Sequence, residues 1–116
     1  MSRERLSSSL WSSYDTAESE GIPALKRLFE IAHGNSHQPT IVARFLLSLY
    51  NGERFPFSLP DLRRLDADIF ADCLSVLLMD YRPRMEVHRY FENGGDLWEG
   101  MASKRGFKSH GDKSWR

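Results

Sequence analysis

The strongest constraint on the fold is a run of apolar residues between positions 69 and 81 that repeats with the period of an α-helix. These side chains cover more than half of a helical circumference, so the helix is predicted to pack against neighbours on several sides. The members of this surface are Ile69, Phe70, Cys73, Leu74, Leu77, Leu78 and Tyr81. The narrower remainder consists of Asp68, Asp72, Ser75 and Met79. Asp66 is the predicted N-cap.

A second apolar stripe predicts a central helix between Ser36 and Asn51. Ser36 suits the N-cap, and Asn51 with the glycine that follows it suits the end. The stripe between them is wide enough for a helix in the middle of the core. It consists of Ile41, Val42, Phe45, Leu46 and Leu49.

Weaker patterns predict the remaining helices. One helix is expected over residues 23–33, because Pro23 is well suited to a first helical turn. A short helix follows over residues 58–64, and a last one starts at Asp96. Residues 85–91 fit both a strand and a helix, and a helix is favoured because no second strand is available for pairing. The predicted fold class is all-α, an irregular five- or six-helix bundle.

Composition divides the 116 residues into three parts. Residues 1–21 are rich in serine and poor in large apolar side chains, which predicts a flexible arm. Residues 22–103 are the predicted helical domain. Residues 104–116 form a basic tail with five lysines and arginines against one aspartate, although the formal net charge of the whole chain is zero.

The chain lacks the sequence signals of several classes of protein. No apolar run approaches the roughly 18 residues that cross a bilayer, and the serine-rich start has no signal-peptide core. The single cysteine, Cys73, has no cysteine partner for a disulfide or a zinc site and lies on the apolar stripe, which predicts a buried, unreactive thiol. These features predict a cytoplasmic protein without a membrane segment.

Residues that could carry catalysis or bind a metal are sparse. Gly34 separates His33 from His37, and His88 with Glu92 would supply only two ligands at helical spacing. Phosphate-cradling glycine loops, nucleophile elbows and zincin motifs are absent from the sequence. We therefore expect no metal, no cofactor and no enzymatic activity. A hydrolase or metal-dependent enzyme stays open as a third hypothesis and would need a pocket with a perturbed titratable group beside His33 or His88.

Parts of the chain resemble a family of short uncharacterised proteins encoded on bacterial prophages, plasmids and integrative elements. The resemblance covers about residues 24–102 and implies no particular activity. It implies a genetic setting in which small proteins often bind a host protein. The matching segments are residues 25–32, residues 45–47 with Asn51, residues 62–68, residues 74–77, residues 86–91 and the Gly94-Gly95 pair.

Two binding hypotheses follow. The first is a protein-interaction module, an inhibitor or adaptor of a host system, whose partner is an unidentified protein or a second copy in a homodimer. Aromatic side chains outside the strongest apolar stripes are its candidate contacts, because such residues dominate interface energies. These are Phe55, Phe57, Tyr90 and Trp98.

The alternative is a nucleic-acid-binding module that uses residues 82–89 and the basic tail. Basic side chains interleaved with aromatic ones suit phosphates and stacked bases. This hypothesis predicts that the basic residues converge on one face. They are Arg82, Arg84, Arg89, Lys104, Arg105 and Lys108.

Overall fold

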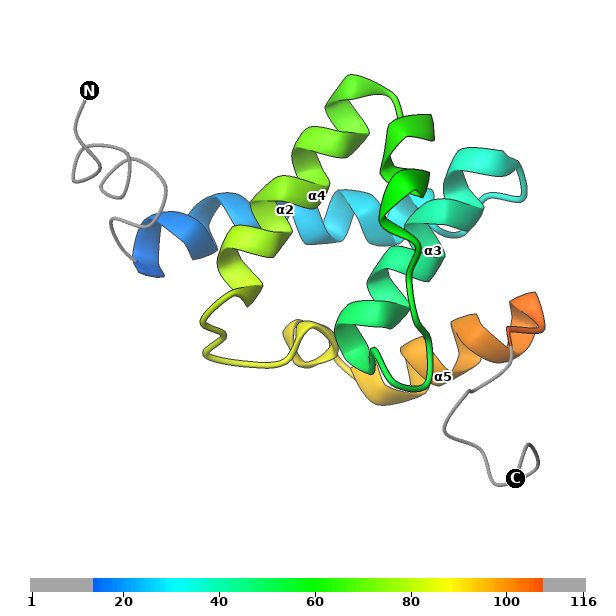
Figure 1. The fold of residues 1–116 in the computed structure, drawn as a ribbon. Coiled ribbons are helices and arrows are strands. Elements are labelled where there is room, and N and C mark those ends of the chain that lie inside the picture. Colours follow the sequence, from blue (N-terminus) through cyan, green and yellow to red (C-terminus); the bar gives the residue numbers. More distant parts are fainter. Residues whose placement is uncertain (1–13, 108–116) are drawn as a thin grey trace.

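A computed structural model describes residues 14–107, and in this part of the chain every regular element is helical (Figure 1). The elements are α2 (Tyr14–Ile31), α3 (His37–Tyr50), η1 (Leu59–Arg64), α4 (Ala67–Asp80), η2 (Val87–Tyr90) and α5 (Gly94–Arg105). The predicted all-α irregular bundle is confirmed. Residues 1–13 and 108–116, which include most of the predicted arm and tail, lie outside the described residues.

Helix α2 is longer than predicted. It begins at Tyr14 and carries Pro23 in its interior, so the predicted start at Pro23 is wrong and residues 14–21 of the predicted arm are helical. Contacts with distant segments explain the extension. Glu18 accepts a hydrogen bond from the Tyr90 hydroxyl at 2.9 Å and forms an ion pair with Arg84 at 3.2 Å. These contacts stabilise the turns before the proline, which local sequence preferences cannot reveal.

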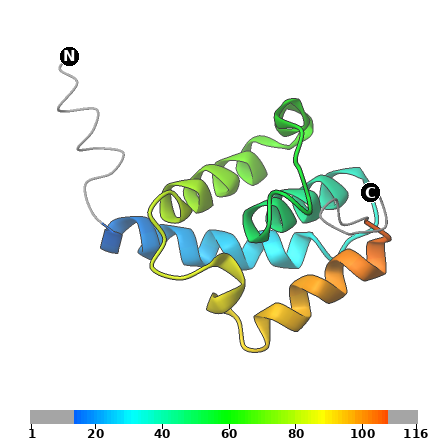
Figure 2. The ribbon, with the colours of Figure 1, turned by 60° about the horizontal axis from the view of Figure 1, so that its bottom comes forward.

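Helices α2 and α4 form the most extensive helix pair and run antiparallel. Gly21 lies against Met79 near one end of the pair, and Arg27 donates two hydrogen bonds to Asp72, at 2.8 and 2.9 Å, further along. Figure 2 shows α2 between α4 on one side and α5 on the other, with α3 beside the far end of α2. The bundle therefore has two central helices: α3, which was predicted to be central, and α2, which was not.

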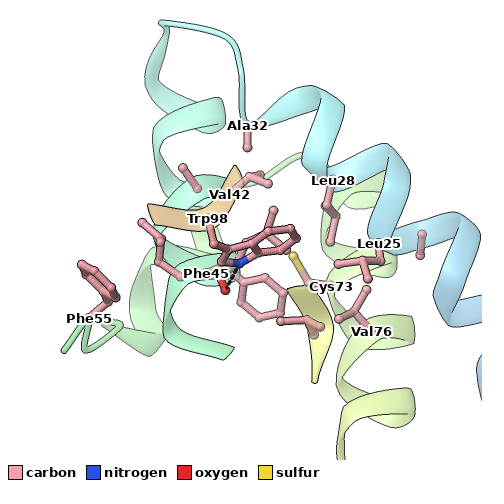
Figure 3. Packing of buried hydrophobic residues seen from close by; sticks show 14 of the residues in the cluster. Leu25, Leu28, Ala32, Val42, Phe45, Phe55, Cys73, Val76 and Trp98 are labelled. Atoms are coloured by element: carbon pink, nitrogen blue, oxygen red, sulfur yellow. Dashed lines mark hydrogen bonds between the residues drawn. The ribbon is translucent and has the colours of Figure 1, made fainter. Parts of the chain in front are cut away.

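The core gathers around the indole of Trp98, which is fully buried (Figure 3). The Trp98 ring stacks on Phe29 with a centroid distance of 5.2 Å, and its Nε1 donates a hydrogen bond to the Leu46 carbonyl at 3.1 Å. Cys73 is also buried, as predicted, and burial, followed by the charge of Asp72, raises its pKa to about 12. A thiol with this pKa stays protonated at neutral pH, which fits an unreactive cysteine.

The later elements match their predicted boundaries to different extents. Helix α3 has the predicted caps Ser36 and Asn51, and η1 covers the predicted short helix. Only one 3-10 turn, η2, forms within the predicted helix at residues 85–91. Helix α5 begins at Gly94, two positions before the predicted cap Asp96, because Asn93 adopts a left-handed conformation with φ of 57° and turns the chain there.

Candidate functional site

Helix α4 packs on one side only. Its inner side buries Cys73, Val76 and Met79 against α2, and α2 is the one described helix that contacts α4 extensively. The prediction that α4 packs on several sides is therefore wrong. Met79, which the sequence pattern placed on the narrower polar side, is 1% exposed.

The outer side of α4 presents a continuous apolar surface. Phe70 is 36% exposed, Leu74 45%, Leu77 37% and Tyr81 63%. Two alanines of α4, Ala67 and Ala71, are also exposed. We call the set the α4 face: Ala67, Phe70, Ala71, Leu74, Leu77 and Tyr81. Figure 2 shows α4 at the edge of the bundle, with α2 beneath it.

The α4 face concentrates the exposed apolar side chains of the described region. Four of the seven large hydrophobic residues that are exposed belong to it, and the other three are Leu59, Met85 and Leu97. Scattered exposed hydrophobics are ordinary on a protein surface, whereas a contiguous stripe of them marks a binding site. The exposed apolar surface is thus concentrated on one helix.

Opposite charges flank the two ends of the α4 face. Asp66 and Asp68 lie exposed at the beginning of α4, and Arg82 lies exposed just after its end. The Arg82 guanidinium lies over the Tyr81 ring, 5.5 Å from its centroid. The surface is therefore apolar along its length, acidic at one end and basic at the other.

The aromatic residues predicted as partner contacts lie elsewhere and are largely covered. Trp98 is 0% exposed and Phe55 is 6% exposed, so both belong to the core and are not available to a partner in this structure. Phe57 and Tyr90 are half-buried: Phe57 packs on Phe45 at a centroid distance of 5.7 Å, and Tyr90 binds Glu18. The structure does not bring these four residues together into one exposed surface.

The basic residues of the alternative hypothesis lie at two ends of the molecule. Arg82 and Arg84 follow the end of α4, near the beginning of α2, whereas Lys104 and Arg105 lie at the distant end of α5 (Figures 1 and 2). Arg89 lies exposed on η2, between these two ends in the chain, and Lys108 lies outside the described residues. The described members of this set therefore do not converge on one face, which the nucleic-acid hypothesis would need.

Arg105 has a structural role instead. Its guanidinium donates hydrogen bonds to the carbonyl oxygens of Ala32 and Gly34, where α2 ends, and to Thr40 Oγ1 at 3.0 Å. Burial and the neighbouring Arg44 lower the pKa of Arg105. This arginine therefore joins α5 to the turn between α2 and α3.

A family model of proteins of unknown function, DUF7673, matches residues 22–106. The chain belongs to this family. Among the curated proteins and the solved structures, no match to the chain was found. The DUF7673 match includes all of α3, α4 and α5 and therefore the whole α4 face. In the described part of the chain, no helix is both long and apolar enough to cross a bilayer.

A groove lies beside His33, where the enzyme hypothesis requires a pocket. It has a volume of about 560 Å³ and lies between α2 and α5, with Phe29, His33, Met101 and Arg105 in its wall. The residues that line it include no carboxylate and no thiol. His33 Nδ1 donates a hydrogen bond to the Phe29 carbonyl at 2.8 Å, which holds the ring against its own helix.

Metal-binding groups are not clustered in residues 14–107: no set of three or more histidine, cysteine, aspartate or glutamate side chains could hold an ion there. The helical spacing expected for His88 and Glu92 is also absent, because η2 ends at Tyr90. Its single turn does not place the two side chains on one helical face.

Asp80 is the last residue of α4 and is half-buried. Its carboxyl group should make the free energy of unfolding depend on pH. Burial, followed by the negative charge of Glu86, raises its pKa from 3.8 to about 6. The stabilisation that comes from protonated Asp80 is full below pH 3.8 and is lost as pH rises through 6. Asp80→Asn should therefore raise the free energy of unfolding at pH 7.5 by about 1–3 kcal/mol. Urea unfolding at pH 7.5 and pH 3.5 checks this, and an equal gain at both pH values would contradict it.

Proposed function

We propose that this DUF7673 chain is a non-enzymatic protein-interaction module and that the α4 face is its binding surface. The observation that carries the proposal is the stripe of four large apolar side chains, each between 36% and 63% exposed, on one side of a well-packed helix. Removing apolar surface from water is favourable by about 25 cal/mol per Å². Burial of this stripe by a partner therefore contributes favourably to the free energy of binding.

The shape of the surface favours a helical partner. An exposed helix with an uninterrupted apolar stripe packs against another helix through interlocking side chains, and its spacing of four, three and four residues is typical of that geometry. The charged residues lie at the ends of the α4 face rather than within it. They can orient a partner without being buried by it.

The residues around the groove support the non-enzymatic part of the proposal. General acid–base or nucleophilic catalysis needs paired groups within hydrogen-bonding reach of each other. In the groove, Arg105 is engaged by backbone carbonyls and His33 by Phe29. The resemblance to proteins of mobile genetic elements supports an accessory role, as an inhibitor or adaptor that binds a host protein.

Affinity capture with matched variants tests the proposal. Wild-type chain, Leu74→Asp and Leu97→Asp are each used to capture proteins from a bacterial lysate. Leu97 is the control because it is a leucine of similar exposure, 38% against 45% for Leu74, on a different helix. An untagged second copy of the chain is added to the lysate, and we expect a partner, either a lysate protein or this copy, that is captured by wild type and Leu97→Asp but lost with Leu74→Asp.

Circular dichroism and urea unfolding establish first that both variants are folded. Capture that is unchanged by Leu74→Asp would rule out the α4 face as the binding surface. Loss of capture with Leu97→Asp alone would move the binding surface to α5.

A further inference from the structure

We infer that the α4 face binds a second copy of the chain, with the two α4 helices antiparallel about a twofold axis that passes near Leu74. The inference rests on the proposed function, because it names the partner of the same surface. It is carried by two features of the described residues: the order of side-chain sizes along α4 and the distribution of charges at its ends.

The order of side chains along α4 fits this symmetry. Ala67 precedes Leu74 by as many residues as Tyr81 follows it. In an antiparallel pair centred on Leu74, Ala67 of each copy lies opposite Tyr81 of the other, so the smallest side chain of the α4 face meets its most exposed aromatic ring. Phe70 likewise lies level with the leucines at 77 and 78 of the second copy. A twofold interface uses the same patch on both copies, which requires this kind of self-complementarity.

The spacing of the α4 face also fits helix pairing. Ala67, Phe70, Leu74, Leu77 and Tyr81 alternate intervals of three and four residues. This pattern keeps one side of each helix toward its partner at a crossing angle of about 20°. Every position of the pattern is exposed in the described structure.

The charges decide between antiparallel and parallel arrangements. Asp66 and Asp68 lie at the beginning of the α4 face and Arg82 lies at its end. An antiparallel pair brings the acidic end of each copy beside Arg82 of the other, whereas a parallel pair would place like charges side by side. The two helix dipoles also oppose each other favourably in the antiparallel arrangement.

The size of the surface sets the expected strength. A pair of 14-residue helices forms an interface smaller than the standard size of stable complexes. We expect a Kd of about 1–100 µM for the dimer. Analytical ultracentrifugation of the full chain over about 1–500 µM covers this range.

The first test compares matched variants in that experiment. Leu74→Asp places two carboxylates at the twofold axis and should weaken the dimer by at least about 100-fold. Leu97→Asp should leave the Kd unchanged. Arg82→Glu and Asp68→Arg should each weaken it about fivefold, and the double variant should recover part of this loss, because the exchanged charges at 68 and 82 attract each other again while Asp66 stays acidic. A wild-type chain that stays monomeric at the highest concentration overturns the inference, as does a dimer that Leu74→Asp does not weaken.

Disulfide trapping tests the orientation. Tagged Ala67→Cys chain and untagged Tyr81→Cys chain are mixed and oxidised, and buried Cys73 does not compete. A disulfide between positions 67 and 81 of different copies is the expected product. A disulfide that joins position 67 to position 67, and none between 67 and 81, would indicate parallel helices and overturn the arrangement.

The outcomes separate the inference from the proposed function. If wild type is monomeric and Leu74→Asp still abolishes capture from the lysate, the partner is a different protein and the α4 face remains a binding surface. If wild type is monomeric and Leu74→Asp leaves capture unchanged, both the dimer and the proposed function fail.

Discussion

Replacing Trp98 with alanine is expected to lower the free energy of unfolding by about 4–5 kcal/mol. The side chain is 0% exposed and stacks on Phe29, so its removal leaves a cavity that the surrounding helices cannot fill by small shifts. It also removes the hydrogen bond that Nε1 donates to the Leu46 carbonyl. A loss of this size is a large fraction of the total stability of a small domain, which is about 5–15 kcal/mol.

Urea unfolding followed by far-UV circular dichroism measures this loss. Leu97→Ala is a suitable control, because Leu97 is the neighbouring residue on α5 but is 38% exposed, and its replacement should cost at most about 1 kcal/mol. Trp98→Phe should have an intermediate effect, since it keeps one aromatic ring in the core but loses the Nε1 donor and part of the buried ring volume. Equal losses for Trp98→Ala and Leu97→Ala would show that α5 does not pack as described.

The sequence was most informative where local signals determine the structure. Ser36 and Asn51 mark the two ends of α3, and both were predicted from residue preferences that act within a few positions, although the Ser36 side chain makes no capping hydrogen bond. The beginning of α2 was missed for the opposite reason. Its first turns depend on contacts of Glu18 with Arg84 and Tyr90, which are distant in the sequence.

The candidate site illustrates a different limit. The apolar period of α4 was recognised, but periodicity alone cannot tell which side of a wide stripe faces the core. Val76 and Met79 turned out to be buried, while Leu74 and Leu77 are exposed. An apolar stripe that is too wide for one neighbouring helix to cover indicates an uncovered surface. The width of this stripe was visible in the sequence.

The separation of the basic residues has a related explanation. Arg105 belongs to a basic stretch of sequence, but its guanidinium turns inward to the carbonyls of Ala32 and Gly34. Those carbonyls lie at the end of α2, where a helix leaves acceptors unpaired. The need to pair them is visible only when α2 and α5 are known to be neighbours.

The second large effect is expected at Gly94, where alanine should lower the free energy of unfolding by about 3 kcal/mol. A Cβ at this position would lie 1.6 Å from the His88 carbonyl oxygen, far inside any permitted contact. The obstacle is backbone rather than a movable side chain, so η2 and the first turn of α5 must separate. Gly94 thus permits the close approach that brings α5, and with it Trp98, into the core.

Gly95 provides the matched control, because a Cβ there would meet nothing within 4 Å. Gly95→Ala should instead raise the free energy of unfolding by about 0.5–1 kcal/mol, since alanine is the better helix former. Urea unfolding of the two variants should therefore give changes of opposite sign at adjacent positions of one helix. Changes of the same sign and size would mean that helix propensity alone governs this turn and that η2 does not touch Gly94.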